Sequence, residues 1–172
     1  MGRLGVGLRL CAVAAVCAVV VGCGGSPGTA TRAGRIPKER FIRQADELCA
    51  DAYGQSQRLS VPPLPPRTPR DLDRVAAFFR AQVAIGSREL AQIQRLGVAV
   101  PGTAAQAENL DLADSLVAEM RAIAYHAHRV HPGRALTHYR KVQAISERAG
   151  ALAKRFGYDV CGQGGVHRVL SR

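Results

Sequence analysis

Four of the five histidines in this chain lie close together, at His126, His128, His131 and His138. His128 and His131 are three residues apart, which places two side chains on one face of a helix, and a tight turn would bring His138 toward them. Three imidazoles with one coordination position left open would hold zinc or copper. The alternative is a set of solvated histidines at a helix end, because His126 would point to the other side and the chain has no Glu-x-x-His pair of the di-iron bundles.

The five cysteines are the other residues with distinctive chemistry, and Cys23 follows a recognisable leader. Two arginines precede a charge-free apolar run over residues 10–21, which suits a secretory signal peptide, because a membrane-spanning helix needs about 20 apolar residues. The sequence Val20-Val21-Gly22-Cys23 then matches the bacterial lipobox, whose cysteine thiol receives a diacylglyceryl group. We expect removal of residues 1–22 and lipidation of Cys23. The alternative is an ordinary secreted protein whose cleavage site ends in cysteine.

Two cysteines remain after this assignment, because Cys11 and Cys17 leave with the signal peptide. An exported protein lies in an oxidising compartment, so Cys49 and Cys161 are expected to form a disulfide. The bridge would tie the segment after the last helix to the first helix. The alternative is a pair of buried, unpaired thiols.

The remaining motifs do not indicate catalysis. Ser26 formally fits the G-x-S-x-G nucleophile elbow, but that elbow needs a strand before it and a helix after it, and here a proline follows the serine. The chain has no phosphate loop, no H-E-x-x-H and no paired-carboxylate signature, so we predict no catalytic residue and no cofactor. Residues 61–67 fit P-x-x-P followed by arginine, which is typical of a polyproline ligand or of a stiff connection between helices.

Apolar residues at spacings of three and four predict four helices, over about residues 38–60, 69–96, 103–130 and 134–156. Thr68 and Pro69 form a start signal, Thr103 and Gln106 stand in capping-box spacing, and Gly157 suits a left-handed helix end. No alternation of period two is long enough for a sheet. Short turns favour one all-α, up-down-up-down four-helix bundle over residues 38–162, with a flexible tether over 23–37 and a flexible tail over 163–172.

The charge is strongly basic, at +11 with 24 Lys and Arg against 13 Asp and Glu. The fourth helix carries much of the excess, so it could rest on anionic lipid headgroups or on wall polymer, or simply form a solvated face. Export and the absence of Trp argue against a nucleic-acid partner.

Two short motifs are similar to those of a known group of proteins. Ala45-Asp46-x2-Cys49 near the mature start, with Gly157-x3-Cys161-Gly162 near the end, resembles the small lipoproteins of actinobacteria, in which such elements flank a helical domain. The resemblance implies an envelope lipoprotein with a helical fold and a disulfide. Such families are largely without assigned activity.

The sequence therefore favours a lipid-anchored binding or interaction module on the outer face of the cytoplasmic membrane. Its partner would be an envelope protein or a small apolar ligand held between helices where small residues leave room. Gly86, in the middle of the second helix, indicates either a close helix crossing or a weak point. A metal-binding lipoprotein that uses His128, His131 and His138 is the alternative.

Overall fold

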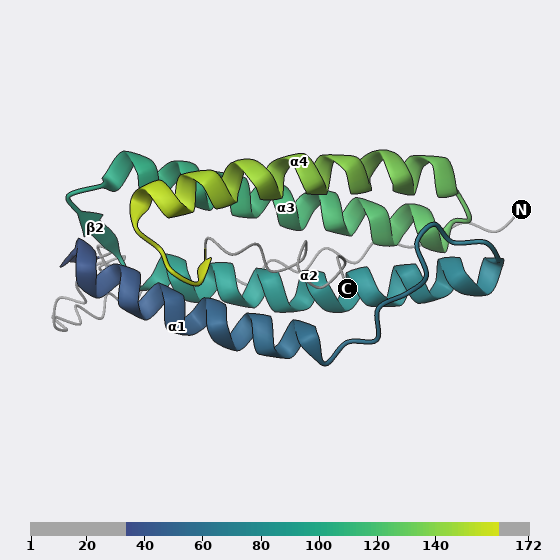
Figure 1. Cartoon of the computed structure of the whole chain (residues 1–172), viewed down its shortest axis with the longest axis horizontal. Coiled ribbons are helices and arrows are strands. Elements are labelled where there is room, and N and C mark those ends of the chain that lie inside the picture. Colours follow the sequence, from purple (N-terminus) through teal and green to yellow (C-terminus); the bar gives the residue numbers. More distant parts are fainter. Residues whose placement is uncertain (1–33, 162–172) are drawn as a thin grey trace, which may run out of the picture. The chain divides into compact units, whose positions relative to one another are not determined.

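The four predicted helices are present in the computed structural model, which describes residues 34–161. In chain order the elements are β1 (Arg35–Pro37), α1 (Lys38–Gln57), α2 (Pro69–Arg95), β2 (Val98–Val100), α3 (Thr103–His128) and α4 (Pro132–Phe156). Each helix runs antiparallel to the next, so the all-α, up-down-up-down bundle is confirmed (Figure 1). The predicted signal peptide, Cys23, most of the tether and the tail lie outside the described residues.

Local sequence signals fix two of the helix ends as expected. The Thr68 hydroxyl accepts the Asp71 N–H at 3.1 Å, and the Asp71 carboxylate accepts the Thr68 N–H at 3.0 Å, which completes a capping box before α2. Gly157 ends α4 in the left-handed region, with φ of 104°. Both ends follow from residues within one turn of the helix.

The predicted capping box at Thr103 is wrong. The N-cap of α3 is Gly102, and no side chain caps this helix. The buried amide of Gln106 instead accepts the Ala99 N–H and donates to the Gly97 carbonyl, both at 2.7 Å. Gln106 is thereby used to satisfy the backbone of the α2–α3 connection, which a buried polar segment requires.

The described part of the chain also contains a short parallel pair of strands that the sequence did not predict. β1 pairs with β2 in a register that sets Ile36 opposite Ala99, and the Val98 N–H donates to the Gly34 carbonyl at 3.1 Å. Ile36 packs against the core. The last residues of the expected tether, 34–37, thus make backbone hydrogen bonds with the α2–α3 connection and an apolar contact with the core.

The core consists of two groups of buried side chains. The first joins α2, α3 and α4 and includes Leu72, Val75, Phe79, Val117, Met120, Ile123 and Val142. The second, which we call the Cys49 cluster, joins α1 to the end of α4 and comprises Phe41, Ala45, Cys49, Ile93, Ala99, Ala153, Phe156 and Tyr158. Both groups consist mainly of residues from the predicted apolar stripes.

The predicted disulfide is confirmed. Cys49 of α1 and Cys161, just after α4, are bonded with an S–S distance of 2.08 Å, and the bridge spans 112 residues of sequence.

Among the described residues, no helix combines the length and the hydrophobicity that crossing a lipid bilayer requires.

Candidate functional site

A cavity of about 190 Å³ lies inside the bundle, and all four helices and the segment after α4 contribute to its walls. Its apolar walls include Ile85, Leu90, Ile93, Leu110, Leu116, Val117 and Met120. Small residues from facing helices leave the space, namely Ala52, Gly86, Ala113, Ser146, Ala149, Gly150 and Ala153. The cavity is larger than an engineered space of roughly 150 Å³ that holds benzene, so a single-ring ligand fits it.

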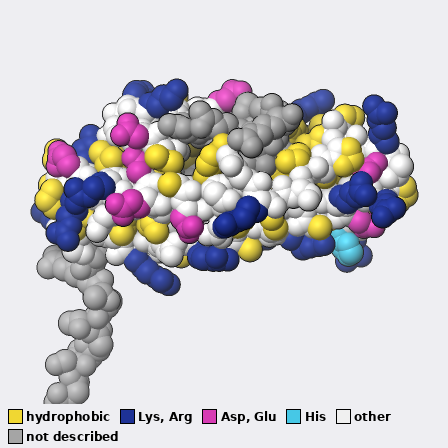
Figure 2. Space-filling view, turned by 60° about the horizontal axis from the view of Figure 1, so that its bottom comes forward, with side chains coloured by type: hydrophobic (Ala, Val, Ile, Leu, Met, Phe, Trp, Pro, Cys, Tyr) yellow, Lys and Arg dark blue, Asp and Glu magenta, His cyan; other side chains and the backbone are white. Residues whose placement is uncertain are grey.

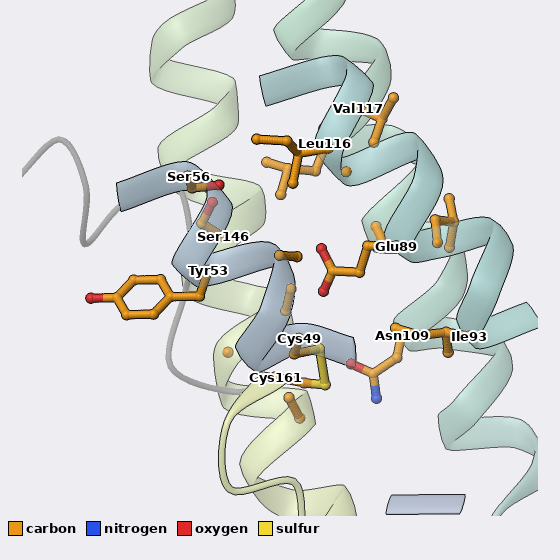
Figure 3. Close-up of a pocket in the computed structure, with 18 of the residues that line it drawn as sticks. Cys49, Tyr53, Ser56, Glu89, Ile93, Asn109, Leu116, Val117, Ser146 and Cys161 are labelled. Carbon is orange, nitrogen blue, oxygen red and sulfur yellow. A yellow bond between two sulfur atoms is a disulfide. The ribbon is translucent and has the colours of Figure 1, made fainter. Parts of the chain in front are cut away.

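Glu89 is the acidic side chain of this cavity. Its carboxylate points into the space enclosed by the helices, whereas the ring of Tyr53 points out of it (Figure 3). No hydrogen bond or ion pair joins Glu89 to another of the residues 34–161. Burial raises the pKa of the Glu89 carboxyl to about 7, because the charged form loses water without gaining a partner.

Gln82 brings a second polar group to the cavity, two helical turns before Glu89. The residue is only 2% exposed, and its Oε1 accepts the Ser56 hydroxyl at 3.0 Å. Its Nε2 has no hydrogen-bond partner among the described residues. Whichever way the amide is turned, one polar atom bonds Ser56 and the other faces the interior without a partner, which is costly for a buried group.

The segment after α4 forms one wall of the cavity and is held in place by Asp46. The Asp46 carboxylate accepts the backbone N–H groups of Asp159, Val160 and Cys161, each at 2.9 Å. Burial, and then the charge of Asp46, raises the pKa of Tyr158, whose ring packs with those of Phe41 and Phe156 in the Cys49 cluster. The disulfide and the Asp46 hydrogen bonds therefore both hold this wall against α1.

Gly86 of α2 lines the cavity and faces Val117 and Met120 of α3. A Cβ built on this glycine would lie 3.4 Å from Val117 Cγ2 and 3.7 Å from Met120 Cε, which is ordinary contact. A methyl group would therefore fit here, so these contacts do not require the close helix crossing that the sequence offered as one explanation of Gly86; the glycine leaves space beside the cavity that it lines.

The histidines are not arranged as the metal hypothesis requires. His126, and not His128, stacks on His138 with ring centroids 5.2 Å apart, and His126 also lies 6.1 Å from the His131 ring. The expectation that His126 points to the other side is wrong, while His128 is exposed. Within residues 34–161, no group of three or more His, Cys, Asp or Glu side chains is placed to hold a metal ion.

His138 has a different partner from the one that the metal hypothesis gave it. Its Nδ1 contacts the Glu119 carboxylate, which also accepts from Lys141 Nζ at 3.2 Å. Glu119 and His126 are seven residues apart on α3 and therefore share the face that meets α4. His128 is two residues further and turns away, which explains its exposure.

The basic side chains are distributed and partly paired. Two cations of α4 pair with acids of α3, Lys141 with Glu119 and Arg148 with Glu108 at 2.9 Å. On the side of the molecule where α1 lies, Lys and Arg side chains are scattered, with Asp and Glu among them (Figure 2). The two ion pairs between α3 and α4 partly neutralise the excess positive charge of α4.

The sequence pointed to the cavity only through its small residues and missed the polar groups inside it. Gln82, Gly86 and Glu89 recur at spacings of four and three on α2, which is a face signal interrupted by a polar and a charged residue. That pattern was available from the sequence.

Comparison of the chain with protein-family models, with curated proteins and with solved structures finds no match in any of the three.

Proposed function

We propose that this protein is a lipid-anchored binding module on the outer face of the cytoplasmic membrane, and that it holds a small, mainly apolar ligand in the cavity between its helices. The observation that carries the ligand is the cavity itself, which combines apolar walls with the Gln82 Nε2, an atom that has no hydrogen-bond partner among the described residues. Ligand sites in proteins have this composition, with a few polar groups set in apolar walls. The lipid anchor is supported by the lipobox at Cys23.

The volume limits the class of ligand. Pockets for drug-sized molecules measure about 300 to 1,000 Å³. At about 190 Å³, this cavity suits a molecule of one ring or a short chain. It is too small for a whole lipid acyl chain or for a peptide segment of a partner protein. A small ligand is therefore favoured over a protein partner as the occupant of this site.

Toluene is a direct probe of the cavity. Ala149 lines it, so Ala149→Phe should fill the space and abolish toluene-induced chemical-shift changes in NMR spectra of the lipid-free mature protein. Ala144→Phe is the matched control, because Ala144 lies on the same helix but is exposed, and this variant should bind as the wild type does. Equal binding by the Ala149→Phe variant, or no binding by the wild type, would contradict the proposed ligand site.

The anchor is tested separately by Cys23→Ala in a bacterial host that processes lipoproteins. This variant should lose the lipid mass increment and leave the membrane fraction, because the thiol is the acceptor of the lipid. Cys17→Ala removes a cysteine of the predicted signal peptide and should remain membrane-bound. A Cys23→Ala protein that stays in the membrane fraction would show that the association does not depend on lipidation.

A further inference from the structure

The cavity walls have a marked charge asymmetry. Glu89 is the one acidic residue in them, and no Lys, Arg or His side chain of the described residues lines the cavity. The other titratable residues that line it are Tyr53 of α1, whose ring points out of the cavity (Figure 3), and Tyr158 after α4, while α3 and α4 contribute none. An ionised Glu89 therefore faces the interior without a counter-charge from any of the four helices.

A carboxylate that has lost water and has no counter-charge among the described residues is unfavourable for the protein alone, and a cation would compensate it. We infer that the cavity selects small hydrophobic amines, with the ammonium group paired to the Glu89 carboxylate and the apolar body against the walls of α2 and α3. This inference rests on the proposed function, because it assigns the ligand class of the same cavity. The raised pKa of Glu89, about 7, agrees with a carboxyl that lacks its partner.

The walls also distinguish an amine from other cations. Divalent metals need six or more oxygen ligands for Ca²⁺ or a near-ideal octahedron for Mg²⁺, and one carboxylate does not supply them. Quaternary ammonium groups are held by cages of several aromatic rings. The Tyr53 ring points away from this cavity (Figure 3), which leaves Tyr158 as the one other aromatic residue of its described walls, too few for a cage. A primary ammonium group has N–H donors, so it forms charge-assisted hydrogen bonds with a carboxylate.

Gln82 agrees with an elongated ligand. Seven residues separate Gln82 from Glu89 on the same helix face, which corresponds to roughly 10 Å along the axis. Ile85 and Gly86 line the stretch between them. An amine bound at Glu89 therefore extends along an apolar wall, with the free polar atom of the Gln82 amide near the far end.

The test compares benzylamine with benzyl alcohol, which has the same shape but no charge, by calorimetric titration of the lipid-free mature protein at pH 8. Benzylamine should bind at least about tenfold more tightly, since its ammonium forms a charge-assisted bond with Glu89. Glu89→Gln, which keeps the side-chain shape, should remove this preference and leave the affinity for benzyl alcohol within about twofold. Glu47→Gln, an exposed change on α1, should leave both affinities unchanged.

The pH profile gives an independent readout. Lowering the pH from 8 to about 5.5 protonates the Glu89 carboxyl while the amine stays charged, so the preference for benzylamine should decline through a midpoint near or below 7 in the wild type and stay flat in the Glu89→Gln variant. Equal binding of the two probes, or a preference that survives Glu89→Gln, overturns the amine inference and leaves the proposed cavity function standing. Absence of binding by toluene, benzylamine and benzyl alcohol alike overturns both.

Discussion

Replacing Cys49 and Cys161 together with alanine is expected to lower the free energy of unfolding by about 4 to 5 kcal/mol, because the bridge removes the entropy of a long loop from the unfolded chain. The loop spans 112 residues, which places it at the upper end of the range for a single disulfide. Urea denaturation monitored by circular dichroism measures the change. The wild type unfolded in the presence of a reductant is the control and should give the same loss.

Removing both cysteines should also weaken ligand binding in the cavity. Cys161, Val160 and Tyr158 line it, so loosening this wall should reduce benzyl alcohol binding under conditions where the helices remain folded. If the variant without both cysteines loses less than about 1 kcal/mol of unfolding free energy, well below the value expected from loop entropy, the segment after α4 is held mainly by other contacts.

Asp46→Ala is the second change with a large expected effect. The Asp46 carboxylate accepts three backbone N–H groups from residues 159–161, and removing it leaves these donors without an acceptor. With hydrogen bonds to charged groups contributing about 1.5 to 3 kcal/mol each and not adding fully, we expect a loss of about 3 to 5 kcal/mol. Asp51→Ala is the control, because Asp51 is exposed and accepts a hydrogen bond from Gln55, one turn away on α1. The loss of stability in this variant should stay within about 0.5 kcal/mol.

The disulfide and Asp46 hold the same segment, so their effects should be coupled. In the variant without both cysteines, Asp46→Ala should cost less than it does in the wild type, because the segment after α4 is already released. A double-mutant cycle by urea denaturation measures this coupling. Fully additive losses would show that Asp46 and the bridge stabilise the fold independently.

The parts of the fold that the sequence predicted are those set by local rules. The helices follow from apolar residues repeating every three or four positions, and Thr68 and Gly157 fix helix ends through contacts within one turn. The disulfide followed from elimination among five cysteines and from the expected compartment. None of these inferences needed the relative orientation of two helices.

The parts that were missed depend on contacts between segments far apart in the sequence. Gln106 has the spacing of a capping residue, but its amide is recruited by the backbone at Gly97 and Ala99, which only the folded α2–α3 connection brings near. β1 is too short for a period-two signal, and it is held by pairing with β2. Asp46 is a charged residue beside an apolar stripe, and its partners lie more than a hundred residues later.

In the candidate site, too, the sequence predicted what depends on local residue types and missed what depends on how the helices face one another. Small residues in the helix stripes predicted either room for a ligand or close packing, and only the rotation of the helices decided in favour of a cavity. Glu89 adjoins the buried Leu90 on α2, and the sequence does not say whether a charged residue beside an apolar one faces inward or outward. His126 was misplaced for this reason, since the orientation of α3 against α4 sets which histidines face His138.

The covalent link between α1 and the end of α4 also determines how the domain responds to tension. A force applied between residue 34 and residue 161 passes from α1 directly through the Cys49–Cys161 bond, so the segment between the two cysteines is shielded from the pull. Its 112-residue span corresponds to roughly 380 Å of chain at about 3.4 Å per residue, which becomes extensible only after reduction. In single-molecule stretching the oxidised domain should therefore yield only the short extension of the residues before Cys49, whatever happens to the helices beyond it.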